Sequence, residues 1–497
     1  MQFALTVGFH YIFVPLTLGL VVCVAAMDTA HMTTGCRGWR RSARFWNRFF
    51  LLAWLVGMAT GYPLRQQLEQ QWSGYNAYAH EVLRAVMGME GLILPVMVVL
   101  VIGLTFAAHR MMPGTRVLAR WLLVLAILTQ AASILTMNAW MQHPVGTELG
   151  EGSVRVISLQ KIFLSSTALC KVAHTLSAGL LTGALFIAAI SAFYLMRQRD
   201  LDVARRSMML ALPTAAVSLA LVVSSGHASG HDVMLHQPMK FAAIEAHWVQ
   251  GEGPSALTLL AVPDMGAQVN HHAVEVPRLL SWLATDGDTS PLGIRELVSQ
   301  AELRIEAALR EKGLAHSGGW RQLYEQSAQA HEDWDSLSAQ QRLHVAALAS
   351  RPNVPVLFTS FRVMVGCALL LMVLLGWAIA RRRVLFAGGD RRTWLLLCLS
   401  LPLPWVATFA GWTVAEVGRQ PWVIHEQMTT AVAAVLPIQS HGIVPLLGWA
   451  TAYILLGILS ATTVIWLVKR GAQPTAWAMR SRRGRSNLWS QLDSRPQ

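Results

Sequence analysis

Long runs of hydrophobic residues, separated by short polar segments, make up most of the sequence. A helix needs about 20 mostly apolar residues to cross the hydrocarbon core of a bilayer. Runs of this length predict nine membrane-spanning helices, near residues 4–27, 46–62, 85–108, 119–140, 166–195, 207–226, 356–380, 393–414 and 441–468. The pattern therefore predicts an all-α polytopic membrane protein.

One long polar segment interrupts this pattern between the sixth and seventh helices. Its first part, Gly226–Trp248, is rich in His, Met and Gly. Apolar residues at helical spacing predict an amphipathic helix over Pro291–Leu314, followed by a polar helix and loops up to Pro355. The chain should then have four parts: helices one to six in residues 1–226, an extracytoplasmic loop in 227–355, helices seven to nine in 356–468 and a basic tail in 469–497.

Composition and charge support a membrane protein and predict its orientation. The 497 residues are 54% hydrophobic and only 13% charged, which is not the composition of a soluble enzyme. The first span has no basic residue before it and no cleavage site after it, so we expect a retained helix that starts outside. Well over half of the 40 Lys and Arg residues then lie inside, as the positive-inside rule requires.

The Arg-rich tail around Arg480–Arg485 is more typical of binding to anionic lipid than to nucleic acid, and no nucleic-acid partner is expected. The five cysteines contain no C-x-x-C pair, so neither a disulfide framework nor a zinc site is indicated. The sequence contains no P-loop, no dinucleotide-binding glycine motif and no nucleophile elbow. We therefore expect any chemistry to lie in the membrane.

A short set of ionisable residues lies within or beside the predicted spans. Such groups are costly in hydrocarbon and usually mark function. They are His10, Glu90, Lys171, His174, Arg362 and, at the outer end of the eighth span, Glu416. At about 1.5 Å per helical residue, His174 and Met364 lie roughly 12 to 14 Å from the outer surface, Arg362 and Glu90 lie a little shallower, and His10 lies at a similar depth.

A His and a Met at the same depth on different helices suit a six-coordinate haem between them. A nearby Arg suits a haem propionate. The alternatives stay open from the residues alone: a His in a span is commonly a hydrogen-bonding residue between helices, and Met is a common filler. Glu90 and Glu416 could equally form ion pairs with Arg84 or Arg419.

Several rare motifs in order along the chain resemble subunit I of cytochrome bd quinol oxidase. They are Gln2–Thr6, His10 with Phe13–Gly19, Met89–Leu92, Asn138–Gln142, Lys171–His174, Gln237–Ala246, Phe361–Met364 and Gly411–Glu416 with Gly418–Trp422. They cover nearly the whole chain. The nine predicted spans and the large outer loop agree with the family's architecture independently.

The resemblance implies three haem groups and assigns ligands to them. His174 and Met364 would be the axial ligands of a low-spin haem b, with Arg362 near its propionates. His10 and Glu416 would ligate a high-spin haem b and haem d, or a third haem b in its place, in an order that the sequence does not fix. The family pattern also gives Glu90 a place beside haem d, and Trp412 and Arg419 belong to the motif around Glu416.

The resemblance also implies the reaction. Lys240 and Glu245 match the positions that handle quinol in the family's outer loop, by binding its hydroxyls and accepting a proton; without the family, a surface ion pair between them would be favoured. The chain would oxidise quinol and reduce O₂ to water in the bacterial inner membrane. Its partners would be subunit II, a small single-span subunit and membrane lipid.

Two features depart from the family pattern. Residues 63–71 differ from it, and Val98 stands where relatives have a second carboxylate in the third span. We then expect either that protons reach Glu90 from another helix or from a partner subunit, or that turnover builds less membrane potential than in relatives. Two other functions remain as alternatives: a redox-silent partner subunit, and a transporter whose buried charges line a pathway.

Overall fold

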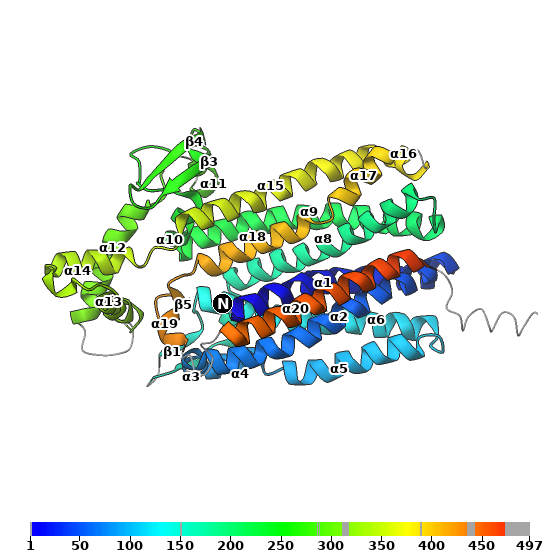
Figure 1. Ribbon diagram of the computed structural model, residues 1–497, viewed down its shortest axis with the longest axis horizontal. Coiled ribbons are helices and arrows are strands. Elements are labelled where there is room, and N and C mark those ends of the chain that lie inside the picture. The colour runs from blue at the N-terminus through cyan, green and yellow to red at the C-terminus, as the bar shows by residue number, and fades with distance from the viewer. Residues whose placement is uncertain are drawn as a thin grey trace, which may run out of the picture.

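The computed structural model describes residues 2–149, 152–285, 287, 289–310, 318–387, 390–434 and 443–472. Long helices lie side by side, and a smaller group of helices with one β-hairpin gathers at one end of this bundle, at the left in Figure 1. The expected all-α membrane class is confirmed. Most of the basic tail, residues 473–497, lies outside the described residues.

The centre of the bundle is built by α1 (Gln2–Thr34), α2 (Arg37–Gln71), α6 (Pro113–Gln142), α8 (Ser166–Met196) and α9 (Leu201–His236). Their core is rich in large aromatic residues that are almost fully buried, namely Phe45, Trp46, Phe49, Phe50 and Tyr194. Helices α1 and α8 cross with their backbones in near contact, because a Cβ added to Gly19 would lie 2.4 Å from the Gly179 carbonyl oxygen. Small residues allow this approach in membrane helices.

Eight helical segments among the described residues are long and apolar enough to cross a membrane. They are Gln2–Thr34, His80–Ala107, Pro113–Gln142, Ser166–Met196, Leu201–His236, Val354–Ala380, Arg391–Val417 and Pro445–Arg470. The ninth predicted span, near 46–62, forms part of α2, which is equally long but more polar. The helix α2 packs against α1 and α9 within the bundle.

Two spans are broken where the sequence predicts continuous helices. The third consists of α4 (His80–Met87) and α5 (Glu90–Ile102), with a π-helical turn at Gly103–Ala107. The eighth consists of α17 (Arg391–Leu399) and α18 (Leu403–Val417). Pro402 and Pro404 explain the second break, since proline removes a backbone donor from the helix.

The sixth span ends later than predicted. Helix α9 continues to His236, so its last ten residues belong to the bundle rather than to the loop. The short helix α10 (Pro238–Glu245) follows directly, with proline in its first turn. The remaining bundle elements are α15 (Val354–Ala380), α16 (Arg382–Ala387), α20 (Ile443–Arg470) and the short outer helices α3 (Ser73–Tyr78), α7 (Leu159–Phe163) and α19 (Thr430–Ala433).

The predicted outer loop is a folded subdomain. It contains α11 (Leu279–Ala284), α12 (Ile294–Arg310), α13 (Gly318–Ala330), a 3₁₀ turn (Trp334–Ser336) and α14 (Ala339–Leu348). The predicted amphipathic helix is confirmed over the residues of α12, while residues 311–317 lie outside the described part. Ile294, Leu297 and Ile305 are buried in it, but Leu303 is 67% exposed.

The sequence analysis missed three antiparallel strand pairs. The longest is the hairpin of β3 (Leu257–Asp264) and β4 (Val269–Val276), which pairs Leu257 with Val276. Their Val, Leu and Thr content, on either side of a four-residue turn, was the available signal. Two shorter pairs, β1 (Thr147–Leu149) with β2 (Val154–Val156) and β5 (Trp422–Ile424) with β6 (Met428–Thr429), lie in other connections.

Candidate functional site

In both candidate histidine ligands, the ring nitrogen Nδ1 is hydrogen-bonded to a neighbouring helix. His174 on α8 has Nδ1 3.1 Å from the Val222 carbonyl oxygen on α9, so Nδ1 must carry the proton. His10 on α1 has Nδ1 2.9 Å from Thr60 Oγ1, and that hydroxyl donates its own proton to the Val56 carbonyl oxygen. Nε2 of each ring makes no hydrogen bond within the described residues, which leaves its lone pair available to a metal.

A glycine faces each of three candidate ligands. A Cβ added to Gly61 would lie 3.3 Å from His10 Cε1, and one added to Gly226 would lie 3.2 Å from His174 Cε1. The corresponding distance from Gly411 to Met364 Sδ is 2.9 Å. Any larger residue at these positions would push the ligand side chain away, so the glycines make the space that the ligands occupy.

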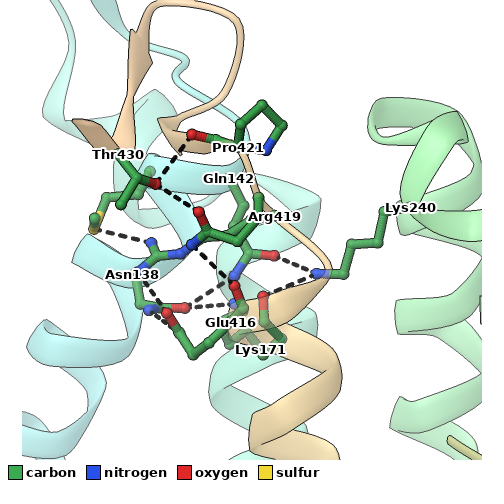
Figure 2. A network of polar contacts seen from close by, with 11 residues as sticks. Asn138, Gln142, Lys171, Lys240, Glu416, Arg419, Pro421 and Thr430 are labelled. Atoms are coloured by element: carbon green, nitrogen blue, oxygen red, sulfur yellow. Dashed lines mark hydrogen bonds and ion pairs between the residues drawn. The ribbon is translucent and has the colours of Figure 1, made fainter. Parts of the chain in front are cut away.

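The carboxylate of Glu416, at the end of α18, is held by several donors (Figure 2). Arg419 Nη2 lies 2.5 Å from Glu416 Oε2, and Asn138 Nδ2 on α6 donates to Glu416 Oε1 over 3.0 Å. Lys171 Nζ on α8 lies 2.6 Å from the Asn138 side-chain oxygen. The ion pair between Glu416 and Arg419, considered as an alternative from the sequence, is therefore present.

This network continues to Lys240 on α10. Gln142 stands one helical turn after Asn138 on α6 and donates to its side-chain oxygen over 3.1 Å. Lys240 Nζ donates to Gln142 Oε1 over 2.8 Å. The chain of contacts in Figure 2 thus joins the outer-loop lysine to Glu416 through two amides. Burial, followed by the nearby charge of Lys171, holds the pKa of Lys240 well below its usual value.

Glu245, at the end of α10, pairs with a different helix. Arg362 Nη2 on α15 lies 2.8 Å from Glu245 Oε2, and Arg362 also donates to the Thr258 carbonyl oxygen on β3. Glu245 and Lys240 are only 7% and 5% exposed and do not contact one another, so the surface-pair alternative is wrong. Burial raises the pKa of Glu245 above its usual value, against the opposing charge of Arg362.

Glu245 lines a cavity of about 420 Å³ between α10, the hairpin and the segment that joins them. The wall includes His247, Trp248, Thr258 and Glu275. Pockets for small organic ligands typically have volumes of about 300 to 1,000 Å³ with a few polar groups.

Comparison with known proteins decides between the candidate functions. The family described as Cytochrome bd terminal oxidase subunit I matches residues 1–472. The chain is 33% identical over 456 residues to cytochrome bd-II ubiquinol oxidase subunit 1 of Escherichia coli (strain K12), which covers 86% of this chain and 87% of the relative. The chain belongs to the cytochrome bd terminal oxidase subunit I family.

Further comparisons agree with this family. Cytochrome bd ubiquinol oxidase subunit 1 of Bacillus subtilis (strain 168) is 29% identical over 479 residues, which cover 95% of this chain and 93% of the relative. The structure of bd oxidase from Geobacillus thermodenitrificans matches the fold with a TM-score of 0.77 at 24% identity, over 95% of this chain and 97% of that one. The protein is thus subunit I of a bd-type quinol oxidase, a multi-pass membrane oxidoreductase of the respiratory chain that uses haem.

The residues of this cytochrome bd subunit fit haem. Among the described residues, no group of three or more His, Cys, Asp or Glu could hold a metal ion together. An axial ligand of haem iron is a single side chain and needs no such group. The free Nε2 atoms of His10 and His174 and the glycine facing Met364 provide the donor set and the space.

The positions of Glu90, Trp412 and Val98 complete the description of the residues that the sequence singled out. Glu90, at the start of α5, accepts from Gln130 Nε2 over 3.2 Å, and Arg65 Nη1 lies 3.6 Å from it. The cation beside Glu90 is thus Arg65 and not Arg84, which the sequence had left open as an alternative. Trp412 on α18 lies beside Tyr11, with ring centroids 6.2 Å apart. Val98 is half-buried on α5.

Asn138 and Gln142 are the site residues that the sequence analysis did not single out. Both lie in a motif that carried the family resemblance, and their spacing of four residues puts them on one face of α6. Buried amides at that spacing, near the outer end of a span, were the signal that could have found them.

Proposed function

We propose that this subunit oxidises quinol in the cavity beside Glu245 and passes the electrons to haems held in the bundle, where O₂ is reduced to water. Oxidation of two quinols releases four electrons and four protons, which is the number of electrons that one O₂ requires. The observation that carries the proposal is the ion pair between Arg362 and Glu245. Arg362 lies two residues before Met364, so it links the cavity wall to a candidate haem ligand.

The ligands are assigned as the resemblance implies. His174 and Met364 would hold a low-spin haem b, and thioether ligation raises its potential. His10 and Glu416 would hold a high-spin haem b and haem d or a third haem b. These groups supply the one-electron steps and the binding of O₂, while the protein supplies positions and charges. Glu90, Arg419 and Trp412 complete the surroundings of the haem pair.

Arg362 would not serve a haem propionate alone, because most of its donors are already used. Its Nε and Nη2 already donate to Thr258 and Glu245, so only Nη1 remains for a propionate. The same guanidinium lies over the ring of Phe358, 4.4 Å from its centroid. Arg362 therefore holds Glu245 at the cavity wall while it faces the haem region with its third nitrogen.

The two loop residues act on quinol in different ways. Glu245 has the raised pKa that a proton acceptor near neutral pH needs, and it takes a hydroxyl proton from quinol. Lys240 is not in the wall of this cavity. Burial disfavours its ammonium form, and it acts on quinol oxidation through the contacts that connect it to Glu416 by way of Gln142 and Asn138. Loss of the proton raises the electron density of the ring and so favours electron transfer.

The orientation proposed from the charge pattern puts the cavity on the outer face of the bacterial inner membrane. The N-terminus is then outside and the C-terminus in the cytoplasm. Subunit II, a small single-span subunit and membrane lipid would cover the exposed apolar faces. On α5, Leu92 is 76% and Val99 68% exposed, and this face offers no side chain for proton transfer.

The proposal is tested by comparing turnover with haem content. Lys240→Ala and Glu245→Ala should each slow quinol oxidation at least about tenfold. The reduced-minus-oxidised spectrum of the purified oxidase should stay that of the parent, because neither residue ligates iron. Glu252→Ala, an exposed change in the same loop, serves as the control. Parental turnover in both loop variants would exclude this quinol site.

A further inference from the structure

A second buried ionic cluster lies at the opposite end of the bundle from the quinol cavity. Asp28 on α1 is 3% exposed and accepts from two arginines of α6: Arg116 Nε on one carboxylate oxygen and Arg120 Nε on the other, both over 3.3 Å. Each arginine is only 4% exposed. One carboxylate thus serves two buried guanidinium groups, and a positive charge is left over.

The remaining donors of these two arginines are not equally satisfied. Arg120 Nη1 donates to the Asn47 side-chain oxygen over 2.7 Å. Arg116 Nη2 is buried and has no acceptor among the described residues. A charged donor buried without an acceptor is costly, so native proteins rarely leave one unmet.

Two further arginines extend the cluster towards the surface. The guanidinium groups of Arg40 and Arg44, on α2, form no ion pair within the described residues, and Arg44 is exposed. Partial burial and then the charge of Arg116 lower the pKa of Arg40, while Asp28 acts in the opposite direction. Four arginines around one carboxylate leave a surplus of positive charge that opens to the outside through Arg40 and Arg44.

The arginine cluster, formed by Arg40, Arg44, Arg116 and Arg120, lies at the level of a membrane interface. It is at the junction of α1 and α2, away from β3, β4 and the helices α12 to α14 (Figure 1). Trp121 on α6 is 41% exposed and donates to Thr29 over 3.0 Å. Tryptophan is enriched where hydrocarbon meets headgroups, so a half-exposed Trp121 beside the cluster is consistent with a place at that interface.

We propose that the arginine cluster binds the phosphate group of an anionic phospholipid. A phosphate diester carries a negative charge and several acceptor oxygens, and guanidinium groups bind such oxygens in pairs. Basic pockets between helices at one membrane face bind lipid headgroups in this way. The phosphate meets Arg40 and Arg44 at the surface and supplies negative charge beside the buried Arg116 and Arg120, and the acyl chains lie along the exposed apolar face of α6.

The test uses the purified complete oxidase in neutral detergent. Native mass spectrometry counts retained phospholipids, and thermal unfolding is followed during titration with phosphatidylglycerol, phosphatidylcholine or inorganic phosphate. Phosphatidylglycerol should bind and raise the unfolding temperature more than either of the others. The double change Arg40→Gln with Arg44→Gln should weaken phosphatidylglycerol binding about 30-fold, which corresponds to about 1 kcal/mol for each arginine.

A matched control removes the same charge elsewhere. Arg37 and Arg382 are exposed and lie outside the cluster, and their joint change to Gln should leave lipid binding near that of the parent. Equal weakening in both double variants would overturn the site as a general charge effect. An equal stabilisation by inorganic phosphate would overturn the lipid assignment. Loss of subunit II from the Arg40→Gln, Arg44→Gln oxidase, with lipid binding unchanged, would instead show that a carboxylate of the partner subunit meets the cluster.

Discussion

The carboxylates Glu245 and Glu416 are both largely enclosed by protein, but they differ in the number of donors around them and in the space beside them. Glu416 accepts from Arg419 and Asn138, and through Asn138 it connects to Lys171. Among the residues that the structure describes, Arg362 alone donates to Glu245, which lines a cavity of about 420 Å³. One carboxylate is enclosed by donors, and the other faces space for a substrate.

This difference suits the two carboxylates to different tasks: Glu416 to carrying a fixed charge, and Glu245 to exchanging a proton. A carboxylate surrounded by a cation and an amide is fixed in position, which suits a ligand or a counter-charge. A carboxylate with one partner, a raised pKa and an adjacent cavity can release and take up protons during turnover. Residue type alone does not distinguish the two, because both are glutamates near the outer end of a span.

The largest effect is expected from Glu416→Ala. The change removes a candidate iron ligand and leaves Arg419 and Asn138 without their acceptor, so one high-spin haem should be lost. Quinol:O₂ activity should fall at least about 100-fold. Haem analysis and O₂ consumption measure both. Glu426→Ala removes a nearby acidic residue outside the network and is the control; if the two variants have equal haem content, Glu416 is not a ligand.

Met364→Leu tests the proposed haem ligand in the bundle separately from the quinol cavity. Leucine has nearly the same volume but no thioether, so the low-spin haem should become high-spin or be lost while the protein still inserts. The α-band of the low-spin haem in the reduced spectrum is the measurement. An unchanged low-spin spectrum would remove Met364 from the ligand set.

Glu245→Gln tests, through the pH dependence of quinol oxidation, whether Glu245 exchanges a proton. The pKa of Glu245 is raised, so the parent should lose quinol oxidation as the pH falls through that pKa and the carboxylate becomes protonated. The Gln variant should be slower by about 10- to 100-fold and should lack this acid limb. A pH profile of quinol oxidation that is identical in shape for both proteins would contradict proton uptake by Glu245.

Gln142→Leu, the smallest change, tests the link between the two regions. It removes the acceptor of Lys240 and the donor to Asn138 while haem ligands stay in place. Turnover should fall only a few-fold, about the effect of one or two buried hydrogen bonds. Gln142→Glu, which keeps an acceptor for Lys240, should recover much of the rate. If Gln142→Leu turns over like the parent, the two regions work independently.

Much of the fold could be predicted, because spans follow from long apolar runs. The break in the eighth span could not be predicted from the sequence, since Pro402 and Pro404 are compatible with either a kink or an interruption. The break in the third span was not predicted either. The hairpin of β3 and β4 was missed because its strands lie in a segment with no long periodic pattern.

The sequence drew attention to residue types that are costly in lipid, such as His174 and Glu416, and their roles as ligands stay predictions. It did not reveal which cation pairs with which carboxylate. Arg362 meets Glu245 across 117 positions of sequence, and Arg65 replaces Arg84 beside Glu90. Such pairs depend on helix rotation, which local patterns do not determine.

Helix α6 carries Arg116 and Arg120 near one end and Asn138 and Gln142 at the other. Over its 30 residues it is a rod of about 45 Å, long enough to reach from one leaflet to the other. The two ends of one rigid helix move together along its axis. A lipid bound at the arginine cluster would therefore share its helix with the amides that lie between Lys240 and Glu416.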